Sequence, residues 1–309
     1  TNDTTSALIA TIEVTPTYEN NGVICSGNSE TFTITVNPGA QVEAVASQVL
    51  CVGESTDEIV FATTNTDGTT TYEWTNDNTD IGLAANGVGD IPSFTVTNDT
   101  TSALIATIEV TPTYENNGVI CSGNSETFTI TVNPGAQVEA VASQVLCVGE
   151  STDEIVFATT NTDGTTTYEW TNDNTDIGLA ANGVGDIPSF VVTGSSLVSE
   201  TATIEVTPTY ENNGVTCTGD SETFTITVNP GAQVEPVTSQ VLCVGDSTDD
   251  IVFTTTNTDG TTTYEWTNDN TDIGLAASGT GDIPSFTLTN DTTSAMFATI
   301  EVTPTYENN

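Results

Sequence analysis

The sequence contains no lysine, no arginine and no histidine among its 309 residues, against 43 aspartates and glutamates. The formal net charge is −43 at pH 7, and no side chain carries a fixed positive charge. Nucleic-acid binding requires lysine and arginine to neutralise phosphates, so that class of partner is excluded. The absence of histidine excludes a Ser-His-Asp triad, a Cys-His pair and an imidazole metal site. Side-chain salt bridges cannot form.

High negative charge can indicate disorder, but the apolar content argues for a folded protein. Hydrophobic residues make up 36% of the chain and 25 glycines add to them, which together approach the roughly 45–50% of ordinary globular domains. Apolar residues alternate with threonine, as in Thr127–Val132, and this period of two is typical of β-strands. No apolar run is long enough to span a membrane. We therefore predict a folded, acidic, all-β protein that is not membrane-embedded.

A tandem repeat organises the chain. Residues 1–94 and 97–190 are identical, which sets a period of 96 residues. A third copy begins at Thr193 and differs most in its first ten residues, and a fourth begins at Thr289. Because the chain starts and stops within a repeat, with neither Met nor a signal peptide at its start, we expect it to be a window on a longer array.

The boundaries between modules are expected at a recurring Asn-Pro-Gly-Ala-Gln segment. It occurs at 37–41, 133–137 and 229–233. Proline cannot donate to a strand ladder and glycine permits a turn, so this segment should end a strand and link two modules. We expect complete modules at 39–134 and 135–230. A C-terminal part of a truncated module precedes them at 1–38, and an N-terminal part of another follows at 231–309.

Each module is predicted to contain short strands separated by turn residues. In the first complete module the expected strands are 48–51, 59–61, 71–74, 91–96, 106–110 and 127–132. About seven short strands in such a length, with one tryptophan per repeat, are typical of an immunoglobulin-like sandwich. No stretch predicts a helix. The predicted fold is all-β: tandem immunoglobulin-like β-sandwich modules arranged as an extended rod.

Four segments of the repeat resemble a known family: Gly68–Trp74, Ile81–Ala84, Ala106–Tyr114 and Thr129–Pro134. They are similar to the PKD-like repeats of very large Bacteroidota cell-surface proteins, above all the giant gliding adhesins of the SprB type. The residues after Trp74 are Thr-Asn-Asp-Asn rather than the acidic Phe-Gly-Asp-like run of PKD domains, which places the chain with the PKD-like relatives. The resemblance covers nearly the whole chain.

The resemblance implies an extracellular, cell-surface location, often reached through type IX secretion. It also implies a structural stalk segment of a long adhesive filament, with gliding motility as its context. Expected partners are neighbouring modules of the same chain, the motility or secretion machinery, and an external surface or polysaccharide at a distant tip. Two other classes remain open: a Ca²⁺-stiffened extender of another large repeat adhesin, and a glycan-binding accessory array.

Six cysteines recur in register, and two connectivities suit the repeat. They fall into two sets with the 96-residue period: Cys25, Cys121 and Cys217 form one, and Cys51, Cys147 and Cys243 form the other. Pairing within a module joins Cys51 to Cys121 and Cys147 to Cys217. It is favoured because the first and last strands of a sandwich are often adjacent, and it would contribute about 4 kcal/mol. Pairing across the linker would instead join Cys25 to Cys51 and its equivalents, and buried free thiols are the third reading.

Oxygen-rich loops are the only candidate cation sites. They lie at 65–68 and 76–80, with Asp90 nearby in sequence. Calcium takes such oxygens, but the spacing matches no EF-hand and turns use the same residues. We expect turn chemistry, no cofactor and at most weakly bound Ca²⁺. Catalytic residues are not expected, since one active site copied into identical adjacent modules would be unusual for an enzyme.

An Asp-Thr motif offers candidate glycosylation sites. Thr4, Thr100 and Thr292 each follow an aspartate, in the pattern that Bacteroidota use for O-glycosylation. The preceding asparagines also fit the N-glycosylation triplet. An unmodified loop is the simpler interpretation, because such triplets are common in threonine-rich chains.

Overall fold

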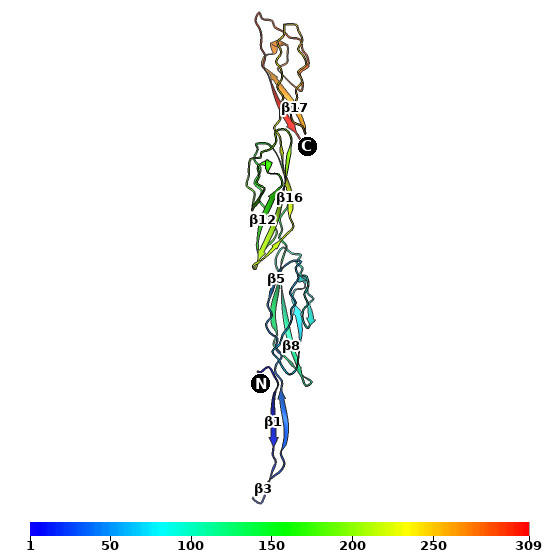
Figure 1. Cartoon of the computed structure of the whole chain (residues 1–309), viewed down its shortest axis with the longest axis vertical. Coiled ribbons are helices and arrows are strands. Elements are labelled where there is room, and N and C mark those ends of the chain that lie inside the picture. Colours follow the sequence, from blue (N-terminus) through cyan, green and yellow to red (C-terminus); the bar gives the residue numbers. More distant parts are fainter. Residues whose placement is uncertain (309) are drawn as a thin grey trace. The chain divides into compact units, whose positions relative to one another are not determined.

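The computed structural model describes residues 1–308 as almost entirely β-structure. Residues 1–38 contain β1 (Leu8–Val14), β2 (Thr17–Asn20), β3 (Val23–Ser26) and β4 (Glu30–Val36). The 39–134 repeat contains β5 (Gln48–Cys51), β6 (Thr69–Asn76), η1 (Thr79–Ile81), β7 (Asn86–Val88), β8 (Leu104–Asn116), β9 (Val119–Ser122) and β10 (Glu126–Asn133). Here η denotes a single turn of 3₁₀-helix. These strands follow the blue-to-green part of Figure 1.

The 135–230 repeat has the same elements in the same order. They are β11 (Gln144–Cys147), β12 (Thr165–Asn172), η2 (Thr175–Ile177), β13 (Asn182–Val184), β14 (Glu200–Asn212), β15 (Val215–Thr218) and β16 (Glu222–Asn229). The last segment contains β17 (Thr261–Asn268), η3 (Thr271–Ile273), β18 (Ser278–Thr280) and β19 (Ile300–Glu307). None of the helices in the described residues is long and apolar enough to cross a membrane.

The described chain forms two compact units. One comprises Thr1–Gln137, Thr159–Thr166 and Thr209–Asp220. The other comprises Val138–Ala158, Thr167–Pro208 and the chain from Ser221 onward. The division runs through the 135–230 repeat, because the loop and the hairpin at one end of that repeat belong to the first unit. The module boundaries expected from the sequence remain a prediction.

Each complete repeat is a β-sandwich with one regular sheet. In the 39–134 repeat the strand order is β5-β10-β8-β6-β7, and β9 pairs with the far end of β8. The first and last strands, β5 and β10, are neighbours as expected, and they run parallel. The opposite layer consists of extended segments joined by isolated bridges, Ser55 to Thr95 and Ile59 to Ile91. The predicted strands at 59–61 and 91–96 are therefore extended but do not form a ladder.

The core lies between these layers and follows the period-two pattern of the sequence. Along β8, Ala106, Ile108 and Val110 are fully buried, and the residues between them point outward. Trp74 lies in the same core. A Cβ on Gly87 would lie 2.2 Å from Cζ2 of Trp74, so only glycine fits opposite the indole ring. The 135–230 repeat buries an equivalent core around Trp170.

The strand β8 is longer than the predicted 106–110 because Pro112 does not interrupt it. One edge of β8 pairs with β6 from Ile108 to Glu115. Its other edge pairs with β10 as far as Val110 and with β9 from Thr113 onward. The proline lies where this second edge changes partner, so its missing N–H is not needed. The β8–β9 hairpin that results extends past the end of β10's pairing, as β14–β15 does in the next repeat.

Candidate functional site: the junctions between repeats

Three junctions between repeats are built from the same residue types. The first lies around Pro38, the second around Pro134 and the third around Pro230, and all three prolines are buried. At the first two, the alanine two residues on is also buried, as Ala40 and Ala136. The Pro-Gly segments are therefore enclosed strand ends rather than exposed connectors. The first two junctions lie within the first compact unit, and the third lies within the second.

The second junction shows how the enclosure is made. The β14–β15 hairpin of the 135–230 repeat packs against the end of β10 in the 39–134 repeat. Asn133, which has no exposed surface, donates from Nδ2 to the Asn212 carbonyl at 3.0 Å. Asn212 donates back from Nδ2 to Oδ1 of Asn133 at 3.3 Å. This reciprocal pair satisfies polar groups that would otherwise be buried without partners.

The first junction repeats this pair, and the third varies it. Asn37 and Asn116 exchange the same two hydrogen bonds, each at 3.2 Å. At the third junction Ser199 stands where the other copies have alanine, and its hydroxyl donates to Oδ1 of Asn229 at 2.9 Å. Asn308 then donates to the Ser199 hydroxyl at 2.7 Å. A serine thus bridges two asparagines that elsewhere bond directly.

At the first two junctions a buried tyrosine fixes the loop that completes the junction, whereas Tyr306 at the third is partly buried and its hydroxyl lies 3.2 Å from that of Ser199. Tyr210 has no exposed surface and donates from its hydroxyl to the Thr162 carbonyl at 2.8 Å, and Tyr114 does the same to Thr66 at 2.7 Å. Burial, and then the charge of Asp163, raise the pKa of the Tyr210 phenol. The neutral donor is therefore retained at physiological pH.

The same loop binds the linker through the Asn161 side chain and the preceding repeat through its backbone. Asn161 donates to the Gly135 carbonyl at 3.1 Å and accepts from the Gln137 N–H at 2.7 Å. The Thr162 N–H donates to the carbonyl of Thr101, in the preceding repeat, at 2.9 Å. Equivalent bonds occur at the other two junctions, from Thr66 to Thr5 and from Thr258 to Leu197. Each junction is therefore held by neutral donors, as a chain without cations requires.

Close packing at the hairpin requires glycine. A Cβ on Gly219 would lie 1.7 Å from the Ala136 carbonyl oxygen, and one on Gly123 would lie 1.9 Å from that of Ala40. By contrast, a Cβ on the linker residue Gly135 would meet nothing closer than 3.8 Å. The glycine that the geometry demands is thus in the hairpin and not in the linker.

A disulfide crosses the second junction. Cys51, at the end of β5, is bonded to Cys217 on β15, with an S–S distance of 1.99 Å, and the two cysteines are 166 residues apart in sequence. Cys121 and Cys147 are free, as are Cys25 and Cys243. The predicted pairs Cys51–Cys121 and Cys147–Cys217 are therefore wrong, and so is pairing across a linker from Cys25 to Cys51.

The parallel pairing of β5 with β10 explains the correction. Cys51 is opposite Asn133, at the C-terminal end of β10. Cys121 precedes the N-terminal end of β10 at Glu126, and the seven residues from there to Asn133 span about 23 Å. The cysteine that does reach Cys51 is carried by the hairpin of the following repeat. The spacing of the cysteines could not have found it, because only this one pair in the sequence is 166 residues apart.

The oxygen-rich loops use their side chains for turn chemistry. Asn76 is buried and its amide donates to the Leu83 carbonyl at 3.1 Å. Oδ1 of Asp77 accepts from the Thr107 N–H at 2.6 Å, and Oδ1 of Asp90 accepts from the Phe61 N–H at 2.8 Å. Within residues 1–308 no group of three or more acidic or cysteine side chains is placed to hold a metal ion. Weak Ca²⁺ binding stays an untested expectation.

The candidate glycosylation sites lie in a tight turn. The Thr100 hydroxyl shares its one hydrogen between Oδ1 of Asn98 at 2.7 Å and the Ser102 carbonyl at 2.8 Å. The Asn98 amide is buried and donates to the carbonyls of Ser102 and Val132. The same turn recurs at Thr4 and Thr292. O-glycosylation there remains a prediction.

Comparisons with known proteins give only distant structural likenesses. No protein-family model matches the chain, and no curated protein matches it either. Among solved structures, Drosophila N-cadherin EC1-4 is similar at 12% identity and a TM-score of 0.36, over 97% of this chain and 84% of that one. Mouse protocadherin-24 EC1-3 is similar at 14% identity and a TM-score of 0.29, over 72% of this chain and 80% of that one. The N-terminal eight Ig domains of DSCAM are similar at 12% identity and a TM-score of 0.31, over 98% of this chain and 54% of that one. These likenesses are too distant to carry a function over to this chain.

Proposed function

We propose that the chain is a non-enzymatic structural segment of a long extracellular adhesin, whose repeats transmit tension from one to the next. The observation that carries this proposal is the repeated junction. Three times, an asparagine pair or its serine-bridged variant and an enclosed Pro-Gly segment join neighbouring repeats, and at the first two junctions a buried tyrosine supports them. Domains that act independently of one another would not need hydrogen-bonded junctions of this kind.

An extracellular location is supported by two features of the chain. The disulfide between Cys51 and Cys217 needs an oxidising compartment to persist. The absence of lysine and arginine leaves no cleavage site for trypsin-like proteases. Both features suit an exposed filament.

The finer proposal is a stalk of the gliding-motility adhesin of a Bacteroidota bacterium, exported by type IX secretion. It rests on the resemblance of Gly68–Trp74 and Ala106–Tyr114 to the PKD-like repeats of such adhesins. In that role the repeats extend the filament, and the motility machinery and an external surface engage its two ends. Antibody against the 39–134 repeat should label intact cells of the source organism and stop their surface spreading. Labelling only after lysis would contradict this role.

The disulfide gives the mechanical proposal a measurable signature. Tension applied at the two termini passes directly from Cys51 to Cys217 and bypasses the residues between them. With 166 residues at up to about 3.6 Å each, an oxidised chain should release roughly 600 Å less contour length than a reduced one. Single-molecule force spectroscopy on the whole chain measures this difference.

The same experiment tests the junctions. If they transmit tension, extension should begin only when a repeat unfolds, in discrete steps. A soft, reversible lengthening at low force before the first step would show that the junctions open freely, and would contradict a stalk. The Cys51→Ser variant should restore the full contour length without reductant, while Cys25→Ser should leave it unchanged.

A further inference from the structure

The disulfide of the second junction offers one accessible sulfur to a reductant. Cys217 is 2% exposed, whereas Cys51 is partly exposed. A thiolate that reduces the bond therefore attacks Sγ of Cys51 and displaces Cys217. The displaced thiolate forms in a buried position, and the chain contains no cationic side chain that could stabilise it. The surroundings of Cys51 thus decide how readily the bond is reduced.

A carboxylate lies beside Cys51. Oε2 of Glu54 accepts a hydrogen bond from the Cys51 N–H at 2.8 Å, and the Glu54 N–H donates to the Cys51 carbonyl at 3.1 Å. The N and Sγ atoms of one cysteine are at most about 4 Å apart, so this oxygen lies within about 7 Å of the attacked sulfur. That distance is shorter than the screening length of about 10 Å at 0.1 M salt. A thiolate that approaches Cys51 is therefore repelled by this carboxylate.

The backbone on both sides of Glu54 is held in place. The Gly53 N–H donates to the Val96 carbonyl at 2.9 Å, and the Val96 N–H donates to the Glu54 carbonyl at 2.8 Å. Val96 has no exposed surface. The turn from Cys51 to Glu54 is therefore attached to the core of its repeat, and the carboxylate stays beside the cysteine.

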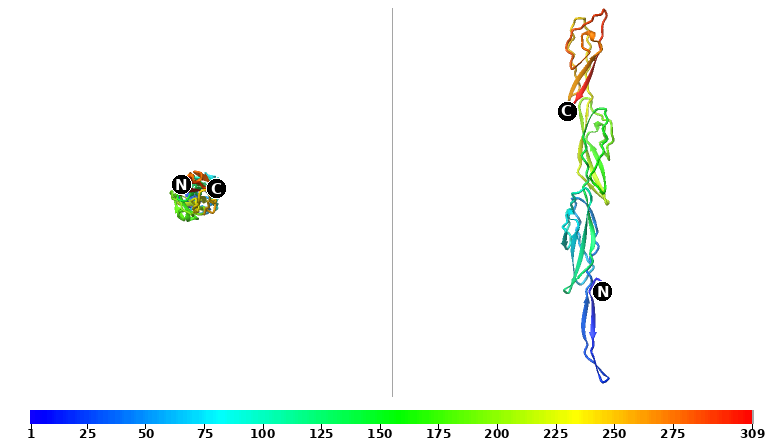
Figure 2. Two further views of the ribbon diagram at one scale, coloured as in Figure 1. Left: turned by 90° about the horizontal axis from the view of Figure 1, so that it is seen from above. Right: turned by 180° about the vertical axis from the view of Figure 1, so that it is seen from behind.

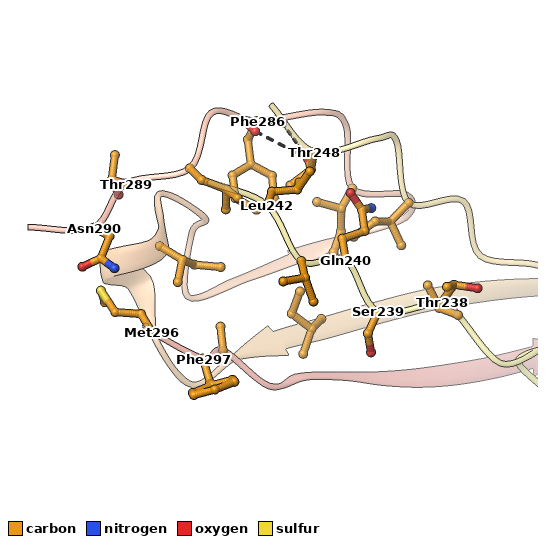
Figure 3. A pocket seen from close by; sticks show the side chains of 18 of the residues that line it. Thr238, Ser239, Gln240, Leu242, Thr248, Phe286, Thr289, Asn290, Met296 and Phe297 are labelled. Atoms are coloured by element: carbon orange, nitrogen blue, oxygen red, sulfur yellow. Dashed lines mark hydrogen bonds between the residues drawn. The ribbon is translucent and has the colours of Figure 1, made fainter. Parts of the chain in front are cut away.

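The next attachment along the chain is Thr56, which is buried. Its N–H donates to the Phe94 carbonyl at 2.9 Å, and its Oγ1 accepts from the Phe94 N–H at 3.2 Å. Figure 3 shows the copies of these two residues in the last segment, Thr248 and Phe286, which are bonded in the same way. This attachment limits the movement of the exposed turn that precedes it.

The same carboxylate is present beside both copies of Cys51, where no disulfide forms. The Cys147 N–H donates to Oε2 of Glu150 at 2.7 Å, and the Cys243 N–H donates to Oδ2 of Asp246 at 3.1 Å. Both cysteines are free. The turn is therefore a property of the local sequence, and the disulfide is not what holds the carboxylate in place.

The charge of the carboxylate is not needed to close the turn. An amide or hydroxyl oxygen can accept the same N–H bond. The charge acts instead on molecules that are themselves charged. Because the attacking form of every thiol is a thiolate, a fixed negative charge slows all thiols, and it slows those with a further negative charge the most.

We propose that Glu54 protects the Cys51–Cys217 disulfide against reduction by anionic thiols, the class to which glutathione belongs. The protection comes from the position of one carboxylate and not from the net charge of the chain. This inference does not depend on the proposed function, because it concerns only the reactivity of the bond in the purified chain.

The reaction that Glu54 slows is an ordinary thiol–disulfide exchange. The first thiolate forms a bond to Sγ of Cys51 while the Cys51–Cys217 bond breaks, and its electron pair passes to Sγ of Cys217, which takes up a proton. A second thiolate attacks the sulfur of the first reagent molecule and displaces Cys51, which is protonated in turn. Two reagent thiols are oxidised to one disulfide, and the two cysteines are reduced.

The test compares three reductants that differ in charge. In their thiolate forms cysteamine has no net charge, 2-mercaptoethanol has a single negative charge and 2-mercaptoethanesulfonate has a double one. The free cysteines of the full chain are first alkylated, and reduction is followed by the mass added when the two new thiols are alkylated. For each reagent the rate with a variant is divided by the rate with the parent chain, which cancels the intrinsic reactivity of the reagent.

Glu54→Gln is the informative variant, because its amide oxygen can still accept from the Cys51 N–H while the charge is gone. In 0.1 M salt it should accelerate the sulfonate reagent about fivefold more than cysteamine. In 1 M salt, where the screening length is about 3 Å, this difference should disappear. Glu54→Asp, which reproduces the residue found at Asp246, should behave like the parent chain.

Glu73→Gln is the matched control, since it removes one exposed charge from β6. In the sheet order β6 lies three strand spacings, or at least about 14 Å, from β5. Figures 1 and 2 show β6 in cyan, alongside β8. The relative rates of the three reagents should be unchanged in this variant.

Three results would overturn the proposal. Equal acceleration of all three reagents by Glu54→Gln would show that the side chain only stabilises the turn. The same change of selectivity in Glu54→Gln and Glu73→Gln would show that the net charge of the chain governs access to the bond. Unchanged rates in Glu54→Gln would show that the carboxylate has no effect on the attacking thiolate.

Discussion

The sharpest test of the junction geometry is the substitution Gly219→Ala. The added Cβ would lie 1.7 Å from the Ala136 carbonyl oxygen, so the hairpin and the linker must separate by well over 1 Å. Overpacking of this kind typically costs about 1–3 kcal/mol. The cost is limited by the alternative of local opening of the hairpin, which the Cys51–Cys217 disulfide still tethers but which would break the two Asn133–Asn212 bonds and the Tyr210 bond. At about 1 kcal/mol each, that alternative costs about 3 kcal/mol in hydrogen bonds.

We therefore expect the free energy of local opening of the β14–β15 hairpin to fall by about 2 kcal/mol, which corresponds to roughly 30-fold faster hydrogen exchange. The hairpin suits this measurement by mass spectrometry, because Val215–Thr218 differs in sequence from its copy Val119–Ser122. Gly135→Ala is the control, since its Cβ meets nothing closer than 3.8 Å. Exchange within about threefold of the parent chain, or equal acceleration by the two variants, would refute the reasoning.

Three further predictions concern the disulfide, the tyrosine and the core. Cys51→Ser should lower the melting temperature seen by tryptophan fluorescence, since a 166-residue loop contributes up to about 5 kcal/mol in the chain-entropy model, whereas Cys25→Ser should not. Burial raises the folded-state pKa of Tyr210 above 10.0, so its contribution is complete below about pH 10 and is lost as pH rises above that. Tyr210→Phe should therefore destabilise the hairpin by about 1 kcal/mol near neutral pH and weaken the alkaline loss in a hydrogen-exchange pH series. Gly183→Ala, whose Cβ would lie 2.2 Å from Trp170, should cost about 1–3 kcal/mol and red-shift the tryptophan emission.

The sequence predicted the sheet better than the layer opposite it. The strands at 48–51, 71–74 and 127–132 are present as β5, β6 and β10, and in 127–132 the alternation of threonine with apolar residues matches the pleat of a half-buried strand. The segment 91–96 has the same apolar pattern but contains Pro92, and it forms only isolated bridges at Ile91 and Thr95. Local pattern shows that a segment is extended, but not whether a neighbour pairs with it along its length.

The junction could not be predicted because it depends on two facts of tertiary structure. Parallel pairing of β5 and β10 places Cys51 at the end of the sheet that faces the next repeat. The change of partner at Pro112, and equally at Pro208, lets a hairpin extend from one repeat to the preceding one. A proline was expected to end a strand. Pro112 and Pro208 instead lie within a strand, at the point where one of its edges changes partner. Neither the parallel pairing nor the change of partner can be predicted from the spacing of residues within a single repeat.

The missing cations constrain how copies of this chain can meet. Any two sandwich faces repel one another, because the 39–134 and 135–230 repeats carry 13 and 14 acidic residues and no compensating charge. Such repulsion opposes lateral pairing and weakens with added salt, with a screening length near 10 Å at 0.1 M. The junctions use amides, hydroxyls, sulfur and apolar side chains, which salt hardly affects. Low ionic strength should therefore suppress side-by-side contact between chains and leave the junctions within each chain intact.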